Sequence, residues 1–119
     1  MLRSVAMLMV GPVAPFEAAT ICEVFGIDRT EDGVPPIDFR TCGPVAGEPL
    51  PTRTGGLQIV PAYGLDGLEG ADLVAVAATP GREFPEEALA ALRRAHAAGA
   101  LLTEVAEGEE PGPSLPGGL

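Results

Sequence analysis

Residues 5–25 read VAMLMVGPVAPFEAATICEVF, and this stretch decides the fold. It opens with six consecutive apolar residues, which is typical of a strand buried on both faces of a parallel sheet. A Gly-Pro turn then breaks the run. From Pro15, which the first turn of a helix tolerates, apolar residues recur at helical spacing, so we expect a helix over residues 15–25. Ligands in such strand–turn–helix units bind where the strand ends and the helix begins.

The remaining segments also alternate between strand patterns and helix patterns. The expected strands cover residues 37–42, 52–60 (two short strands around Gly55-Gly56), 72–77 and 100–105, and a second long helix is expected over residues 85–98. Strands that alternate with helices predict an α/β fold with a doubly wound, mostly parallel sheet, and the Gly-Gly pair predicts a small β-hairpin. With only two long helices, part of one sheet face and the edge of the last strand should stay bare, which favours dimerisation or aggregation.

Two shorter segments carry predictions about individual side chains. Residues 61–70 predict at most one short helical piece, with Tyr63, Leu65 and Leu68 facing inward. In the second long helix, His96 shares a side with Leu89 and Leu92, so we expect it to be packed or to act as a positive charge near the helix end.

Composition and charge exclude several classes of protein. The formal net charge is −10 and all seven basic residues are Arg, so we expect no direct binding of nucleic acid by this chain. No stretch approaches the roughly 20 apolar residues of a membrane span, so no membrane partner is expected. The first ten residues lack the features of a signal peptide, and two cysteines do not form a disulfide framework, so we expect a cytoplasmic protein.

Glu17 is the first candidate site residue because it lies in the first turn of the expected helix, just past the end of a strand. Its carboxyl group can line a ligand pocket there, or it can simply complement the positive end of the helix dipole. Gly11, Pro12 and Thr79 are the other candidates for the ligand pocket, since they follow the ends of two buried strands. No cofactor and no metal site is expected, because there is one His and no cluster of thiols.

Both cysteines have a structural interpretation. Cys22 lies on the apolar stripe of the expected helix, where burial raises a thiol pKa and lowers its reactivity. Cys42 ends an expected strand and is predicted to be the more exposed of the two. Nothing beside either residue in the sequence would activate it as a nucleophile, and no Gly-x-Ser-x-Gly motif supplies another.

Five runs of residues share their order and spacing with a known family: VAMLMV, VAPFEAATICEVFGIDR, DGVPPIDFRTC, TRTGGLQIVPAYGLDGL and ALAALRRAHAAGA. They resemble the N-terminal half of GlxA-like AraC-type transcriptional regulators, over residues 4–102. The most specific part is the pattern P-F-E-x-x-x-x-C-E-V-F-G. In that family the N-terminal domain is of the ThiJ/PfpI type, which is class I glutamine amidotransferase-like.

The resemblance implies a flavodoxin-like sandwich that senses a small-molecule effector and forms a homodimer, while a separate helix-turn-helix region binds DNA. In enzymes of the same superfamily a glutamate at the start of the first helix, matched here by Glu17, partners a cysteine on a sharp elbow. This chain departs from the pattern in two places. The family has Asp-Gly where this chain has Gly-Pro, and Ala106 stands about where the elbow cysteine would be.

The resemblance and its departures together set the functional expectation. We expect residues 1–105 to be a truncated, incomplete sensing and dimerisation domain without its helix-turn-helix region, and residues 106–119 to be a disordered acidic tail rich in Gly and Pro. Without the elbow cysteine, we expect no catalysis. The alternatives are a small ThiJ/PfpI-type hydrolase or hydratase that uses Glu17 and a thiol, and a non-functional remnant.

Overall fold

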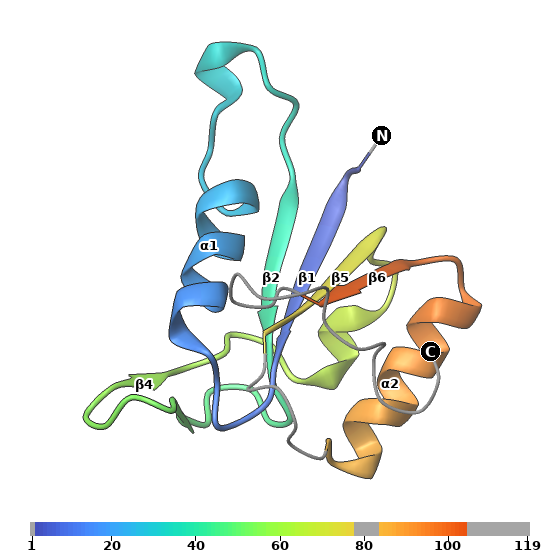
Figure 1. Cartoon of the computed structure of the whole chain (residues 1–119). Coiled ribbons are helices and arrows are strands. Elements are labelled where there is room, and N and C mark those ends of the chain that lie inside the picture. Colours follow the sequence, from blue (N-terminus) through green and yellow to red (C-terminus); the bar gives the residue numbers. More distant parts are fainter. Residues whose placement is uncertain (1, 78–83, 105–119) are drawn as a thin grey trace.

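The protein is built on a four-stranded parallel sheet with strand order β2-β1-β5-β6 (Figure 1). The computed structural model describes residues 2–77 and 84–104. Its strands are β1 (Ser4–Met9), β2 (Asp38–Cys42), β5 (Leu73–Ala77) and β6 (Leu101–Glu104), and β3 (Leu50–Pro51) forms a separate antiparallel pair with β4 (Gln58–Ile59). The fold is therefore the α/β, flavodoxin-like, mostly parallel sheet with a small hairpin that the sequence predicts.

Strand β1 lies at the centre of the sheet because it is apolar on both of its faces. Residues 5–10 are at most 4% exposed. Met7 is in register with Thr41 of β2 on one side and with Ala75 of β5 on the other. A strand paired on both edges and covered on both faces must be continuously apolar, which explains the unbroken run in the sequence.

Helices cover the two faces of the sheet, one long helix on each. Helix α1 (Pro15–Phe25) and the hairpin lie on one face, where the alternate β1 residues Met7 and Met9 meet them. Helix α2 (Glu86–Ala97) and the short helix η2 (Leu65–Leu68) cover the other face, which receives Ala6 and Leu8. A second short helix, η1 (Thr30–Asp32), lies in the loop between α1 and β2.

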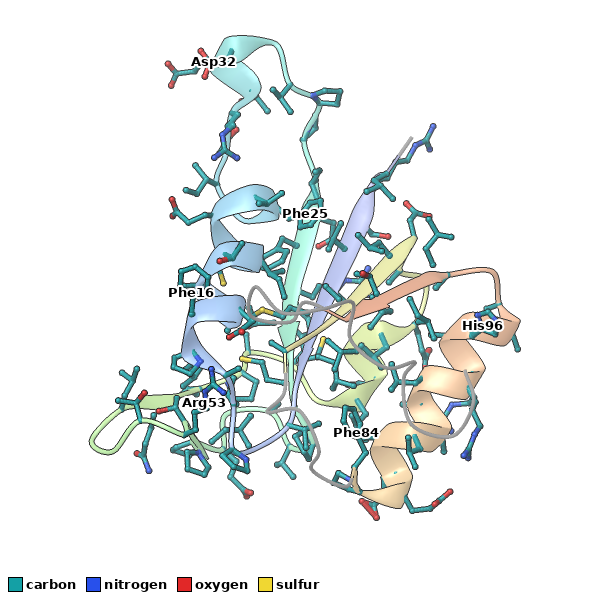
Figure 2. All side chains as sticks on the ribbon, viewed as in Figure 1. Phe16, Phe25, Asp32, Arg53, Phe84 and His96 are labelled. Atoms are coloured by element: carbon teal, nitrogen blue, oxygen red, sulfur yellow. The ribbon has the colours of Figure 1, made fainter. Side chains whose placement is uncertain are left out.

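Helix α2 packs through small residues rather than through the side that His96 occupies. Its buried residues are Ala88, Ala91, Leu92 and Ala95. His96 is exposed and lies on the outer surface of the helix (Figure 2). Leu92 therefore faces the core as predicted. Of the two alternatives for His96, packing is excluded by its exposure, and its position as a basic residue in the last turn of the helix remains.

The segment between the hairpin and β5 also corrects one prediction. Leu68 is buried, but Tyr63 is 44% exposed rather than inward-facing. The backbone of Tyr63 explains this, because its N–H donates to the Thr41 carbonyl (2.9 Å) and its carbonyl accepts from the Gly43 N–H (3.0 Å). This pairing continues the edge of β2 and turns the side chain toward solvent.

The hairpin starts two residues earlier than expected, at Leu50. The side chain of Thr52 forms hydrogen bonds within the turn, because its hydroxyl donates to the Thr54 and Leu57 carbonyls (2.8 and 3.0 Å). The Thr52 N–H also donates to the Leu57 carbonyl (3.2 Å), so Thr52 closes the turn and the strand pair lies just outside it.

In the part of the chain that the structure describes, strand β6 has an exposed apolar side chain on the α1 face of the sheet. Its register places Leu102 beside Val74, which belongs to the core under α2, and Leu101 beside Leu73. Successive side chains of a strand point to opposite faces, so Leu101 lies on the α1 side of the sheet. It is 65% exposed.

No helix within residues 2–77 and 84–104 is long and apolar enough to cross a membrane.

Arg40 and Gly67 fix η2 against the sheet. The Arg40 guanidinium donates to the Gly67 and Glu69 carbonyls (2.9 Å each) and pairs with Asp38 (2.8 Å). Gly67 lies so close to β2 that an added Cβ would come within 2.6 Å of the Cys42 Sγ. The sequence -Gly-Leu-Asp-Gly-Leu- thus permits a contact that any larger residue would prevent.

We expect Gly67→Ala to lower the free energy of unfolding by about 1–3 kcal/mol, the usual cost of overpacking a core. Gly55→Ala is the matched control, because an added Cβ there would meet nothing within 4 Å and the change should stay within about 0.5 kcal/mol. Urea unfolding followed by circular dichroism measures both. Equal losses in the two variants would contradict the close packing of η2 on Cys42.

Candidate functional site

Glu17 is the buried acid of the site, 1% exposed in the first turn of α1. Helix α1 packs on β1 and β5 and buries Ala18 and Ile21 beside it. Because β1 and β5 are parallel, their carboxyl ends meet at one edge of the sheet, and the first turn of α1 lies at that edge. The sequence predicts this position; it does not predict that the side chain is buried almost completely.

The Glu17 carboxyl group is not fully satisfied. Its Oε1 atom is buried and has no hydrogen-bond partner among the described residues. Leaving a polar group buried without a partner costs about 1–3 kcal/mol, and more when the group is charged. Such a group in a native fold needs an explanation, and a ligand that supplies the missing donor is one of the accepted ones.

The first turn of α1 has no side-chain cap. Ala14 stands at the N-cap position, its side chain has no oxygen that could accept a hydrogen bond, and Pro15 follows it at the first helical position. An acid in this turn gains about 0.3–1 kcal/mol from the helix dipole at an exposed site. In partly buried geometries the gain can reach about 2 kcal/mol, but the dipole still leaves the Oε1 atom without a hydrogen-bond donor.

The Gly-Pro turn is held by the hairpin. The Val13 N–H donates to the Pro51 carbonyl (2.8 Å), and the Arg53 N–H donates to the Val13 carbonyl (3.1 Å). Figure 2 shows Arg53 beside the segment that joins β1 to α1. An added Cβ on Gly11 would lie 3.2 Å from Pro51 Cδ, so this glycine lets the turn approach the hairpin closely.

The structure places three of the four predicted pocket residues in one short segment. Gly11 and Pro12 are partly exposed in the turn, and Glu17 follows them at the start of α1. Thr79 lies outside the described residues. The described residues line cavities of about 220, 280 and 460 Å³, and none of these includes Gly11, Pro12 or Glu17.

The two cysteines lie on opposite sides of the sheet. Cys42 is fully buried in the core under α2, where desolvation raises the pKa of its thiol to about 11. The prediction that Cys42 is the more exposed cysteine was therefore wrong, because β2 ends beneath η2. Cys22 is partly buried against the core under α1, and its thiol pKa is raised first by burial and then by the charge of Glu23.

Neither thiol can serve Glu17 as a nucleophile. Cys42 has the sheet between itself and α1. Cys22 is five residues after Glu17 on the same helix, which turns the two side chains about 140° apart at 3.6 residues per turn. Raised thiol pKa values also leave little thiolate at neutral pH. Among residues 2–77 and 84–104, no group of three or more His, Cys, Asp or Glu residues could hold a metal ion.

With this geometry in place, the chain can be compared with known proteins. No protein-family model and no curated protein matches it. Among solved structures, its fold is similar to the crystal structure of an AraC family transcriptional regulator from Pseudomonas putida, with a TM-score of 0.65 over 86% of this chain and 14% sequence identity. The chain spans 55% of the length of that protein. At this identity the likeness establishes the shared fold.

Thiol labelling tests the positions of the two cysteines. With a chromogenic disulfide at neutral pH, we expect Cys22 to react slowly and Cys42 to react only after the protein unfolds, because both pKa values are raised and Cys42 is inaccessible. Cys22→Ser and Cys42→Ser identify which thiol is labelled. Fast native-state labelling of Cys42 would contradict the burial described above.

The cost of burying Glu17 is also measurable. Glu17→Met replaces the carboxyl with an apolar group of similar length, and we expect the free energy of unfolding to rise by about 1–3 kcal/mol. Glu23→Met on the exposed side of the same helix should change it by less than about 0.5 kcal/mol. Equilibrium unfolding in urea gives both values, and a loss of stability in Glu17→Met would show that the carboxyl is well satisfied.

Proposed function

We propose that this chain is the effector-sensing domain of an AraC-type transcriptional regulator and that Glu17 contacts the effector. The observation that carries the proposal is the buried Glu17 carboxyl oxygen without a partner, at the edge where doubly wound folds bind ligands. The shared fold with an AraC family regulator supports the choice of protein class.

The chemistry of the site suits binding better than catalysis. The hydrolase or hydratase alternative needs a nucleophilic thiol within hydrogen-bond reach of the Glu17 carboxyl group. The cysteines at 22 and 42 do not offer one, for the reasons of position and pKa given above. A hydrolase or hydratase that pairs Glu17 with either thiol is therefore disfavoured.

The finer assignment rests on the sequence resemblance. We infer a GlxA-like regulator whose sensing domain is of the ThiJ/PfpI type, over residues 1–105, with residues 106–119 as a separate tail. A homodimer is part of this proposal, and the exposed Leu101 on the uncovered part of the sheet supports an association through that face. A cytoplasmic location follows from the same regulator assignment.

A thermal-shift screen against a metabolite library tests the proposal. A true effector at about 100 times its dissociation constant stabilises the folded state by about 2.7 kcal/mol, which raises the melting temperature by roughly 10 °C in a domain of this size. We expect Glu17→Gln to weaken binding of that effector at least tenfold, while Glu23→Gln on the exposed side of α1 leaves it unchanged.

Two results would overturn the proposal. An effector that binds Glu17→Gln as tightly as the wild-type protein would remove Glu17 from the site. Turnover of a screened compound that disappears in Cys22→Ser or Cys42→Ser would establish an enzyme instead.

A further inference from the structure

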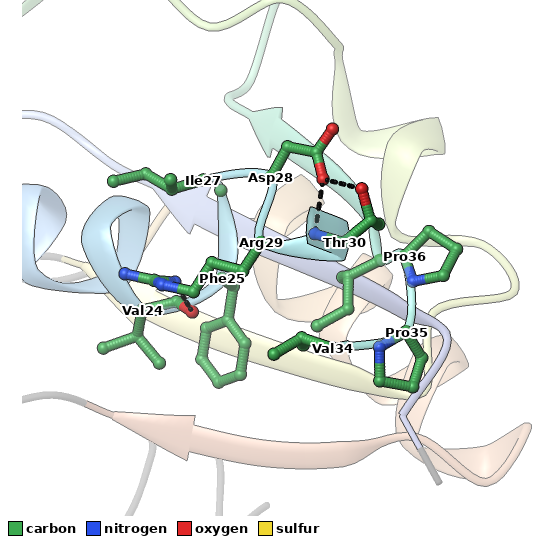
Figure 3. Close-up of a pocket in the computed structure, with 11 residues that line it drawn as sticks. Val24, Phe25, Ile27, Asp28, Arg29, Thr30, Val34, Pro35 and Pro36 are labelled. Atoms are coloured by element: carbon green, nitrogen blue, oxygen red, sulfur yellow. Dashed lines mark hydrogen bonds between the residues drawn. The ribbon is translucent and has the colours of Figure 1, made fainter. Parts of the chain in front are cut away.

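A hollow lies at the end of α1 that is away from Glu17. It has a volume of about 220 Å³ and is formed by the last residues of α1 and the loop that leads to β2 (Figure 3). Helix α1 has eleven residues and so spans about 16 Å, which separates this hollow from the first turn. It is therefore independent of the function proposed for Glu17.

The floor of this hollow is apolar, and its side chains are unusually exposed. Val24, Ile27 and Val34 are 54%, 45% and 42% exposed, and all three line it. Figure 3 shows Phe25 and Val34 pointing toward one another across the hollow. Apolar side chains gathered on a surface in this way mark interaction sites more often than isolated exposed residues do.

The loop is held in shape before anything binds. The Thr30 N–H and hydroxyl both donate to one Asp28 carboxyl oxygen (2.9 and 2.7 Å), and the Val34 N–H donates to the Arg29 carbonyl (3.3 Å). Gly33 closes the turn with a φ of 82°, a left-handed conformation that suits glycine. A preformed hollow reduces the ordering cost that binding must overcome.

The rim of the hollow is acidic. Asp28 lines the hollow, and Glu23, Glu31 and Asp32 are exposed residues that lie close to its lining residues in the chain. The single basic residue between them, Arg29, directs its guanidinium to the Val24 and Glu23 carbonyls at the end of α1 (3.2 and 2.9 Å). Its charge therefore offsets the negative end of the helix dipole. The hydrogen bonds from the Thr30 N–H and hydroxyl lower the pKa of Asp28 below its ordinary value.

The volume of the hollow and the charges beside it indicate what kind of molecule binds there. Pockets for drug-sized molecules usually measure about 300–1,000 Å³, so this hollow is better matched to one or two side chains of a partner. A second copy of this chain would bring one acidic rim against another, in a protein whose formal charge is already −10, and like charges in close apposition disfavour that contact.

We propose that the hollow formed by residues 24–37 docks a peptide segment in which a large apolar side chain is flanked by Lys or Arg. The apolar side chain fills the space between Phe25 and Val34, and the basic residues meet the carboxylates of Glu31, Asp32 and Asp28. Apolar contact provides most of the affinity, and the charges provide selectivity and faster association.

Selection from a random peptide library displayed on phage, with the full chain as bait, tests the proposal. We expect enriched peptides to carry an apolar residue between basic ones. A labelled synthetic copy should bind in fluorescence anisotropy, and its affinity should fall several-fold between about 0.05 M and about 0.5 M salt as screening increases. In nuclear magnetic resonance spectra, the shifted amide signals should lie within residues 24–37.

Variants separate the apolar and the electrostatic parts. Val34→Asp should weaken binding at least tenfold. Val60→Asp makes the same substitution at a valine near the hairpin that is 57% exposed, and it should leave binding unchanged. Glu31→Lys with Asp32→Lys should weaken the basic peptide while sparing a neutral analogue. Unchanged thermal melting confirms that each variant is folded, and the lysine pair decides the question if Val34→Asp unfolds.

Several outcomes would overturn the proposal. These are a library that yields no peptide sensitive to Val34→Asp, equal enrichment of acidic and basic peptides, and signals that shift elsewhere in the chain. Self-association that sedimentation analysis detects in the wild type and not in Val34→Asp would assign the hollow to a second copy instead.

Discussion

The structure depends on the burial of β1 between two parallel neighbours. Residues 5–10 are nearly inaccessible, and every backbone group in such a strand must find its partner in β2 or β5. Because alternate side chains enter different cores, β1 also joins the layer under α1 to the layer under α2. At about 25 cal/mol per Å² of apolar surface buried, this strand is a leading source of the hydrophobic stabilisation.

The placement of α1 follows from β1, and the two surfaces of interest follow from α1. The short Gly-Pro turn brings the first turn of α1 back over the carboxyl ends of β1 and β5, which buries Glu17. The apolar side of the helix must stay on the sheet, so the acid in its first turn cannot rotate into solvent. At the other end the same helix supplies Val24 and Phe25 to the acidic-rimmed hollow. Helix α1 therefore carries the buried Glu17 carboxyl group at its start and the exposed apolar side chains of the hollow at its end.

Local pattern predicts most of this fold, because strand and helix periods are properties of neighbouring residues. The α1 helix begins at Pro15 and ends at Phe25 as the spacing indicates. The errors concern side chains whose surroundings come from distant segments. Cys42 is buried because η2 packs over the end of β2, and Tyr63 is exposed because its backbone pairs with β2. The sequence pattern does not predict the hollow either, because the residues that line it come from both ends of a loop that the fold brings together.

The central claim is that the Glu17 carboxyl lacks a partner in the free domain and gains one from the effector. Carbon-13 resonances of the glutamate side-chain carboxyls test it directly, with the Glu17 signal identified by its absence in Glu17→Gln. We expect this signal to shift on saturation with an effector from the screen, while the exposed Glu23 signal stays in place. A Glu17 signal that does not move at saturation would contradict it.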